Sequence, residues 1–171
     1  MKGGGTAHTH GKWRTISRMM KTSSLSILAL QETHLTEEHR NELERRYDRM
    51  KIYSSPDPDN ETGKGGVAII LNKHNTSWQD AQVEYTIPGR AITLTVKWGH
   101  SSTMRITAIY APAGTATEKA VFWTTLRDIW RADRTKKPDI LLGDLNMHQE
   151  KARPVWGVWH GHHGCTIAAH P

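Results

Sequence analysis

Three short apolar runs constrain the fold of this chain more than any other feature of its sequence. Residues 25–30, 67–71 and 140–142 are stretches made almost entirely of aliphatic side chains. Runs of this length and composition are typical of β-strands that are covered on both faces, and for residues 25–30 a buried parallel strand fits best. We therefore expect packed layers on each side of the strands, which is the arrangement of a layered α/β fold.

Helical periodicity appears in three segments between and around these runs. Residues 12–21 place apolar side chains at helical spacing, a second helix is expected to start after the N-cap candidate Thr36 and to end near Met50, and a third covers residues 115–130. Two further strands are predicted where Ile92, Leu94 and Val96, and then residues 104–108, alternate with polar side chains. This alternation predicts that one face of these strands is wetter than the other.

The composition suggests one domain between two less regular ends. The 171 residues are enough for a single core. We expect a flexible glycine-rich segment at residues 1–11, the domain at 12–147, and an irregular tail rich in His, Trp and Gly at 148–171. Residues 54–66 have the Pro, Asp, Asn and Gly content of a loop.

Charge and cysteine content restrict the partners and the compartment. The chain has 23 basic and 17 acidic residues, a net charge of +6 that modestly favours a polyanionic partner. Its one cysteine, Cys165, allows no intrachain disulfide and suits a reducing compartment. No window approaches the roughly 20 apolar residues of a membrane span, so no membrane association is expected.

Polar residues stand where three of the predicted strands end. Glu32 follows the first apolar run, Tyr110 ends an alternating strand, and Asp144 and Asn146 follow the run at 140–142. Glutamate can anchor a hard cation such as Mg²⁺, tyrosine and asparagine can donate to phosphate oxygens, and aspartate can orient or deprotonate a water. A helix-capping or salt-bridged glutamate, a tyrosine sealing a core and an Asp-Asn turn are the structural alternatives, and single residues leave them open.

The motifs around these residues occur together and in a recognisable order. They are Leu30-Gln31-Glu32-Thr33-His34, Gly65-Gly66-Val67-Ala68, Ile109-Tyr110-Ala111-Pro112 and Gly143-Asp144-Leu145-Asn146. This set resembles the endonuclease/exonuclease/phosphatase (DNase I-like) superfamily. With the added segment Ile87-Pro88-Gly89-Arg90-Ala91, it looks like the apurinic-type endonuclease domain of non-LTR (LINE-like, fungal) retrotransposons. The resemblance spans residues 17–146.

This resemblance implies a fold, a reaction and roles for four residues. The fold is a four-layered α/β sandwich with the active site at the shared edge of two sheets. The reaction is hydrolysis of DNA phosphodiester bonds with Mg²⁺ or Mn²⁺. Glu32 corresponds to the metal-binding glutamate and Tyr110 to the phosphate-contacting tyrosine, while Asp144 and Asn146 correspond to the catalytic aspartate and asparagine. A reverse transcriptase domain is the expected neighbour in a full-length element, and the nucleus is the expected place of action.

The sequence also departs from the family pattern. No asparagine precedes Trp13 to match the family's first-strand asparagine, and no Ser-Asp-His segment occurs. We therefore expect the fold to lack its first strand and its C-terminal part, with marginal stability and impaired activity. A truncated element and misplaced gene boundaries both explain this pattern.

Three alternative interpretations remain. In the first, the chain is an inactive remnant that binds nucleic acid. In the second, it is a phosphatase or phosphodiesterase of the same superfamily. In the third, a zinc site is formed in the tail by His160, His162, His163 and Cys165, although structural zinc sites usually take their ligands from two spaced elements. The other tail histidines, His148 and His170, match no family motif.

Overall fold

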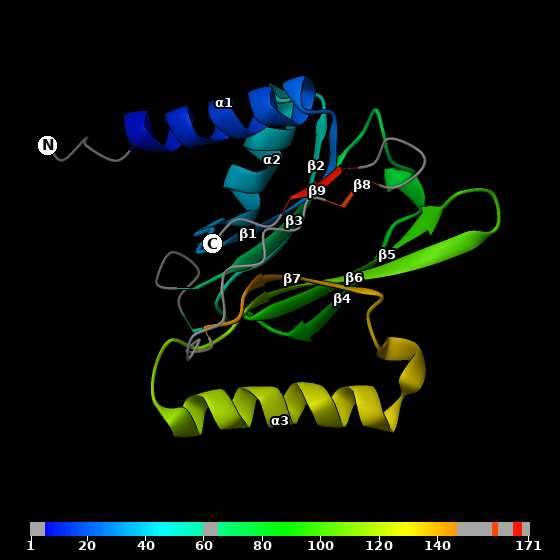
Figure 1. Cartoon of the computed structure of the whole chain (residues 1–171). Helices are drawn as coiled ribbons and strands as arrows, with labels where there is room; N and C mark the ends of the chain where they lie inside the picture. Colours follow the sequence, from blue (N-terminus) through cyan, green and yellow to red (C-terminus); the bar gives the residue numbers. More distant parts are fainter. Residues whose placement is uncertain (1–5, 60–64, 147–158, 161–165, 169–171) are drawn as a thin grey trace, which may run out of the picture.

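The computed structural model describes residues 6–59, 65–146, 159–160 and 166–168 (Figure 1). Along these ranges, helices and strands follow one another in the order α1 (Thr6–Thr22), β1 (Leu25–Gln31), α2 (Glu37–Arg46), β2 (Met50–Ser55), β3 (Val67–Asn72), η1 (Trp78–Asp80), β4 (Gln82–Ile87), β5 (Ala91–Trp98), β6 (Ser102–Tyr110), α3 (Ala116–Ala132), η2 (Arg134–Lys136), β7 (Ile140–Asp144), β8 (Trp159–His160) and β9 (Thr166–Ala168).

The strands form two sheets. The first has the order β2-β3-β1-β9-β8 and the second the order β4-β5-β6-β7. Strand β1 is antiparallel to β3 and parallel to β9, so the expected parallel arrangement holds on one side of β1 and is wrong on the other. In the second sheet β5 is antiparallel to β4 and β6, whereas β6 and β7 are parallel.

The two sheets stack face to face, and helices cover their outer faces (Figure 1). Helices α1 and α2 lie on the first sheet and α3 lies on the second, which makes four layers. This confirms the predicted four-layered α/β sandwich. The described helices include none that combines the length and the apolarity needed to cross a membrane.

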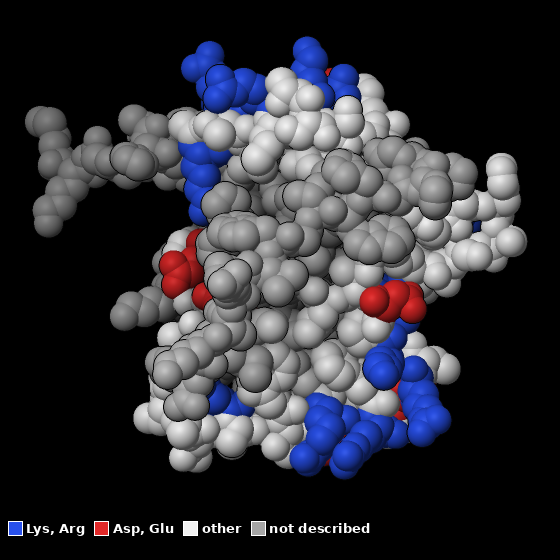
Figure 2. Space-filling model, in the orientation of Figure 1, with Lys and Arg blue, Asp and Glu red and all other residues white. Residues whose placement is uncertain are grey.

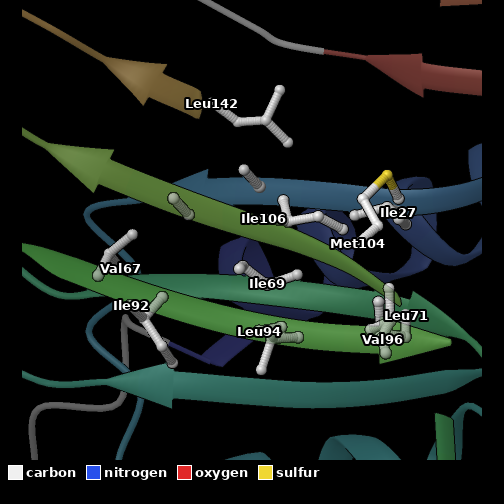
Figure 3. Close-up of a cluster of buried hydrophobic side chains, with 12 residues drawn as sticks. Ile27, Val67, Ile69, Leu71, Ile92, Leu94, Val96, Met104, Ile106 and Leu142 are labelled. Carbon is white, nitrogen blue, oxygen red and sulfur yellow. The ribbon is translucent and has the colours of Figure 1, made fainter. Parts of the chain in front are cut away.

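The main core fills the space between the sheets (Figure 3). Its fully buried aliphatic residues come from β1 and β3 on one side and from β5 and β6 on the other, among them Ile27, Ile69, Leu71, Ile92, Leu94 and Ile106. A second cluster joins α1 and α2 to the first sheet, and a third joins α3 to the second sheet.

Strand β3 shows why the apolar runs are unbroken. Val67, Ile69 and Leu71 belong to the core between the sheets, while Ala68 and Ile70 belong to the cluster under α1 and α2. Because both faces of the strand are covered, residues 67–71 are all apolar. The predicted burial is thereby confirmed for residues 67–71, and residues 25–29 of β1 are buried as well, whereas Leu30 is half-buried.

Two helix boundaries differ from the prediction. Helix α1 begins at Thr6, so the loop expected up to Gly11 is wrong for residues 6–11, and residues 1–5 lie outside the described part. Helix α2 starts after the Thr36 N-cap as predicted, with Thr36 Oγ1 accepting from His39 N at 3.2 Å, but ends at Arg46. Met50 is therefore the first residue of β2 and not the end of the helix.

The wetter face predicted for β5 and β6 is present only at one end of the two strands, where Lys97 and Thr103 are exposed, and toward the other end the same face is buried. Thr93 and Thr107 are 1% and 0% exposed, and their hydroxyls hydrogen-bond each other at 2.7 Å. Thr86 of β4 extends this ladder with a 2.8 Å bond to Thr93. On the same face, Ala91 and Ile109 pack in the cluster under α3. The threonines satisfy their hydroxyls with one another and so fit under a helix.

Strand β7 is less buried than predicted. Leu142 is 7% exposed, but Leu141 is 39% exposed, because β7 lies at the end of the strand order of its sheet.

The tail is described only where it forms β8 and β9, which extend the first sheet along β1. The proposed zinc ligands His162, His163 and Cys165 lie outside the described residues, as do His148 and His170.

Candidate active site

The four residues singled out in the sequence meet at one edge of the sandwich. Glu32 follows the last residue of β1, Tyr110 ends β6 and Asp144 ends β7. Tyr110 and Asp144 are partners in the parallel ladder between β6 and β7. Asn146 lies two residues beyond Asp144. The fold therefore gathers polar groups from three segments at the carboxyl ends of three strands.

Glu32 and Tyr110 are joined directly across the two sheets. The Tyr110 hydroxyl donates a hydrogen bond to Glu32 Oε1 at 2.5 Å, although 78 residues separate the two in sequence. The Glu32 carboxylate that accepts this bond is the main reason why the pKa of Tyr110 is raised above 10.0, and burial adds to the effect. The tyrosine is consequently kept as a neutral hydrogen-bond donor.

Asp144 and Asn146 are brought together by a turn. Asn146 N donates to Asp144 Oδ1 at 2.9 Å, and Asn146 Nδ2 donates to the Ala111 carbonyl at 2.6 Å. The Ala111 amide in turn donates to the Asp144 carbonyl at 2.9 Å. Asn146 has a φ of 44°, so the backbone has left the extended conformation of β7 at this residue. The Asp-Asn turn, considered as a structural alternative, is present, and it lies within the site.

Arg90 is a further site residue. Its segment, residues 87–91, is part of the family resemblance, but no role was predicted for it. Its guanidinium carbon lies 5.0 Å from the centroid of the Tyr110 ring, and its carbonyl accepts from Tyr110 N at 2.8 Å. The positive charge of Arg90 lowers the pKa of Tyr110, which partly opposes the effect of Glu32. The Pro-Gly turn before Arg90 was visible in the sequence, but a single basic residue after a turn carries no pattern of its own.

Two glycines allow the close backbone approaches that the site needs. Gly143 precedes Asp144 with a φ of 127°, and a Cβ there would stand 2.0 Å from the Ile109 carbonyl oxygen. Gly66 has a φ of 85°, and its Cβ would stand 2.9 Å from Thr33 Oγ1 beside Glu32. These positions lie in the Gly65-Gly66 and Gly143-Asp144 motifs, which gives the motif glycines a steric reason.

The donor set suits a hydrated hard cation better than a closed metal cage. Within the described ranges, no group of three or more His, Cys, Asp or Glu residues could hold a metal ion. Glu32 and Asp144 each use one carboxylate oxygen in the bonds above, and the described residues offer no hydrogen-bond partner to Glu32 Oε2 or Asp144 Oδ2. Mg²⁺ keeps several waters and needs only one or two carboxylates, so it fits this set.

Comparison with known families decides the assignment. Residues 11–166 match the model of the endonuclease/exonuclease/phosphatase family. The chain belongs to this family. The members of the family are hydrolytic nucleases and phosphatases, so the family covers hydrolysis of phosphodiester and phosphate ester bonds. No curated protein sequence is significantly similar to the chain.

Several solved structures share the fold. The chain is similar to the endonuclease domain of TRAS1, a telomere-specific non-LTR retrotransposon, at 13% identity and a TM-score of 0.56, covering 80% of this chain and 53% of that chain. It is similar to the 3′ phosphatase NExo from Neisseria, solved with a product DNA hairpin, at 19% identity and a TM-score of 0.58. The match covers 80% of this chain and 53% of that chain. It is also similar to a mannosyl-6-phosphatase from Bacteroides thetaiotaomicron, at 12% identity and a TM-score of 0.60. That match covers 84% of this chain and 59% of that chain. The chain thus spans little more than half the length of each.

Proposed function

We propose that the chain is a nuclease of the non-LTR retrotransposon type, which nicks DNA by metal-dependent hydrolysis of a phosphodiester bond. The observation that carries this proposal is the convergence of Glu32, Tyr110, Asp144 and Asn146 at one edge of the sandwich. Membership of a family of phosphoester hydrolases supports the reaction class. In this setting a reverse transcriptase domain is the expected partner.

Glu32 is the proposed metal ligand. Its side chain is exposed, and the Tyr110 hydroxyl fixes one carboxylate oxygen while the other faces no described partner. Members of this family generally use divalent metal ions, which supports Mg²⁺ or Mn²⁺ here. When bound, such a cation stabilises the negative charge that develops on the phosphoryl oxygens.

Asp144 and Asn146 are the proposed groups that act on the water and the phosphate. Asp144 Oδ2 accepts a proton from the attacking water, whose oxygen forms the new bond to phosphorus as the bond to the leaving oxygen breaks. Asn146 holds the carboxylate through its backbone amide. One N–H of its side chain is used by Ala111, and the other remains to donate to a phosphoryl oxygen. Tyr110 takes part by holding the Glu32 carboxylate, to which its single O–H donates.

DNA is the proposed substrate. The net charge of +6 favours a polyanion. Among the similar structures, one is the endonuclease domain of a retrotransposon and another was solved with a DNA hairpin, which supports DNA as the ligand. The similarity to a mannosyl-6-phosphatase keeps phosphate monoesters as the second candidate substrate class.

The test is nicking of supercoiled plasmid in the presence of Mg²⁺. The variants Glu32→Ala and Asp144→Ala are expected to lose at least about a hundredfold in rate. The control is Asp128→Ala, which removes an exposed carboxylate on α3 whose ion pair within the described residues is with Arg127, and it should nick like the parent chain. Nicking that persists in both site variants would refute the assignment.

Two further measurements separate the competing functions. Hydrolysis of a sugar phosphate monoester without plasmid nicking would indicate a phosphatase. Salt-dependent binding of duplex DNA, with neither reaction in protein whose circular dichroism shows it to be folded, would indicate a nucleic-acid-binding protein without catalysis.

A further inference from the structure

The outward face of α1 carries a row of three basic side chains. Arg14, Arg18 and Lys21 are spaced i, i+4 and i+7, so they lie along one side of the helix. All three are exposed. The opposite side of α1 is the one that packs on the first sheet, through the buried residues Trp13, Ile16 and Met20. We call Arg14, Arg18 and Lys21 the basic stripe.

The charges of the basic stripe are not neutralised within the described parts of the chain. Helix α1 contains no acidic residue, and no ion pair joins the stripe to any described carboxylate. Figure 2 shows Lys and Arg side chains gathered along the upper edge of the molecule, over the layer of α1 and α2, with little acidic surface among them. The basic stripe is therefore a surface of positive charge.

Three basic residues of the second sheet and its connections are arranged differently. Arg105 and Lys136 both bind Glu84, at 3.0 and 3.2 Å, and Lys97 binds Asp80 at 2.9 Å. These ion pairs connect strands and loops of the second sheet, so the three basic side chains have a structural role. The basic stripe has no such role, because α1 packs on the sheet through its apolar side. Like charges four residues apart also destabilise a helix.

The direction of α1 relates the stripe to the candidate active site. Only Ser23 and Ser24 separate α1 from β1, and α1 packs along this strand, so the two run in opposite directions (Figure 1). The Arg14 end of the stripe therefore points toward the end of β1 that carries Glu32. From Arg14 to Lys21 the helix rises about 10 Å, a length over which duplex DNA presents several phosphates.

We propose that the basic stripe is a second contact surface for the DNA phosphate backbone, outside the active site. This rests on the proposed function in that DNA is the ligand. The stripe supplies affinity and orientation and takes no part in the chemistry, because it lies on the outer layer while the reacting groups lie at the edge of the two sheets. Exposed guanidinium and ammonium groups fit phosphate oxygens and release condensed counterions when they bind.

Salt-dependent binding of a 20-base-pair duplex in EDTA, where cleavage cannot interfere, tests the stripe. The triple variant Arg14→Ala, Arg18→Ala, Lys21→Ala is expected to bind at least tenfold more weakly at about 0.1 M salt. The slope of log affinity against log salt should become shallower by up to about 2.7, since each lost phosphate contact removes about 0.9. The charge-preserving variant Arg14→Lys, Arg18→Lys should retain the parent slope.

A second triple variant controls for net charge. Arg131→Ala, Arg134→Ala, Lys137→Ala removes three exposed basic side chains near the end of α3 and in and after η2. It should bind DNA more tightly than the stripe variant. Equal losses in the two triple variants would show that only net charge matters and would overturn the proposal, as would parent-like binding by the stripe variant.

Hydrolysis of bis(4-nitrophenyl) phosphate separates this proposal from the proposed function. This small diester cannot reach the stripe, so the stripe variant should hydrolyse it at the parent rate, and a loss there would overturn the proposal. If the parent chain hydrolyses no diester but the stripe variant still has the shallower salt slope, the stripe is supported and the nuclease assignment fails. A stripe variant that loses binding to phosphatidylserine vesicles but not to DNA would identify a membrane contact instead and overturn the proposal.

Discussion

Gly143→Ala should be strongly destabilising, because two separate effects act at this position. With φ at 127°, an L side chain is strained, which costs about 1–3 kcal/mol. The new Cβ would also stand 2.0 Å from the carbonyl oxygen and 2.9 Å from the carbonyl carbon of Ile109, and these backbone atoms cannot swing aside. Forcing the two strands apart adds about 1–3 kcal/mol, as overpacking does in cores. The expected total is about 2–6 kcal/mol.

Urea denaturation followed by circular dichroism measures this loss. With a slope of about 2 kcal/mol/M, the midpoint should fall by at least about 1 M. Gly99→Ala is the matched control, since Gly99 also has a positive φ, 68°, but no atom lies within 4 Å of its Cβ. It should lose only the conformational part, about 1–2 kcal/mol. Equal midpoints for the two variants would refute the steric reasoning at Gly143.

Three further predictions concern a helix cap and the site. Thr115→Ala removes the capping box of α3 and should cost about 1 kcal/mol in urea denaturation, whereas Thr124→Ala, on the exposed side of the same helix, should cost nothing. Glu32→Gln should lower the pKa of Tyr110 toward 10.0, measured by tyrosinate absorbance, and Glu37→Gln should leave it unchanged. Because the folded-state pKa of Tyr110 is raised, its contribution to stability is complete below pH 10 and is lost as the pH rises through that pKa. Glu32→Gly should be about 1 kcal/mol more stable than Glu32→Ala, because residue 32 has a φ of 49°; equal stability would contradict the strain.

The site residues could be predicted because each lies at or just after the end of a strand that is recognisable from its own sequence. Glu32 and Asp144 come directly after apolar runs, and Tyr110 ends an alternating one. Bringing the three together requires the face-to-face packing of two sheets, which no local pattern specifies, and here the family resemblance supplied that step. The role of Arg90 was not predicted for the same reason, because its place over Tyr110 depends on the turn between β4 and β5.

Strands β2 and β4 were missed for different physical reasons. Leu43, Tyr47 and Met50 are spaced i, i+4 and i+7, so helical periodicity runs on into the first residue of β2. The helix stops earlier because residue 47 adopts an extended conformation, with φ at −122°. In β4 the side chains are mostly exposed or half-buried, with Tyr85 51% exposed, so burial imposes little pattern on its sequence.

Backbone strain at the site explains why its geometry lies beyond the reach of sequence patterns. Four non-glycine residues in the described ranges have positive φ, and three of them, Glu32, His34 and Asn146, lie in the site motifs. Each such residue costs on the order of 1–3 kcal/mol and persists only where its surroundings fix it. Asparagine tolerates this conformation, but glutamate has no local preference for it. The Tyr110 hydroxyl, which arrives from the opposite sheet, holds the Glu32 side chain. The orientation of the proposed metal ligand is therefore a property of the assembled sandwich, and any change that separates the two sheets at this edge should release it.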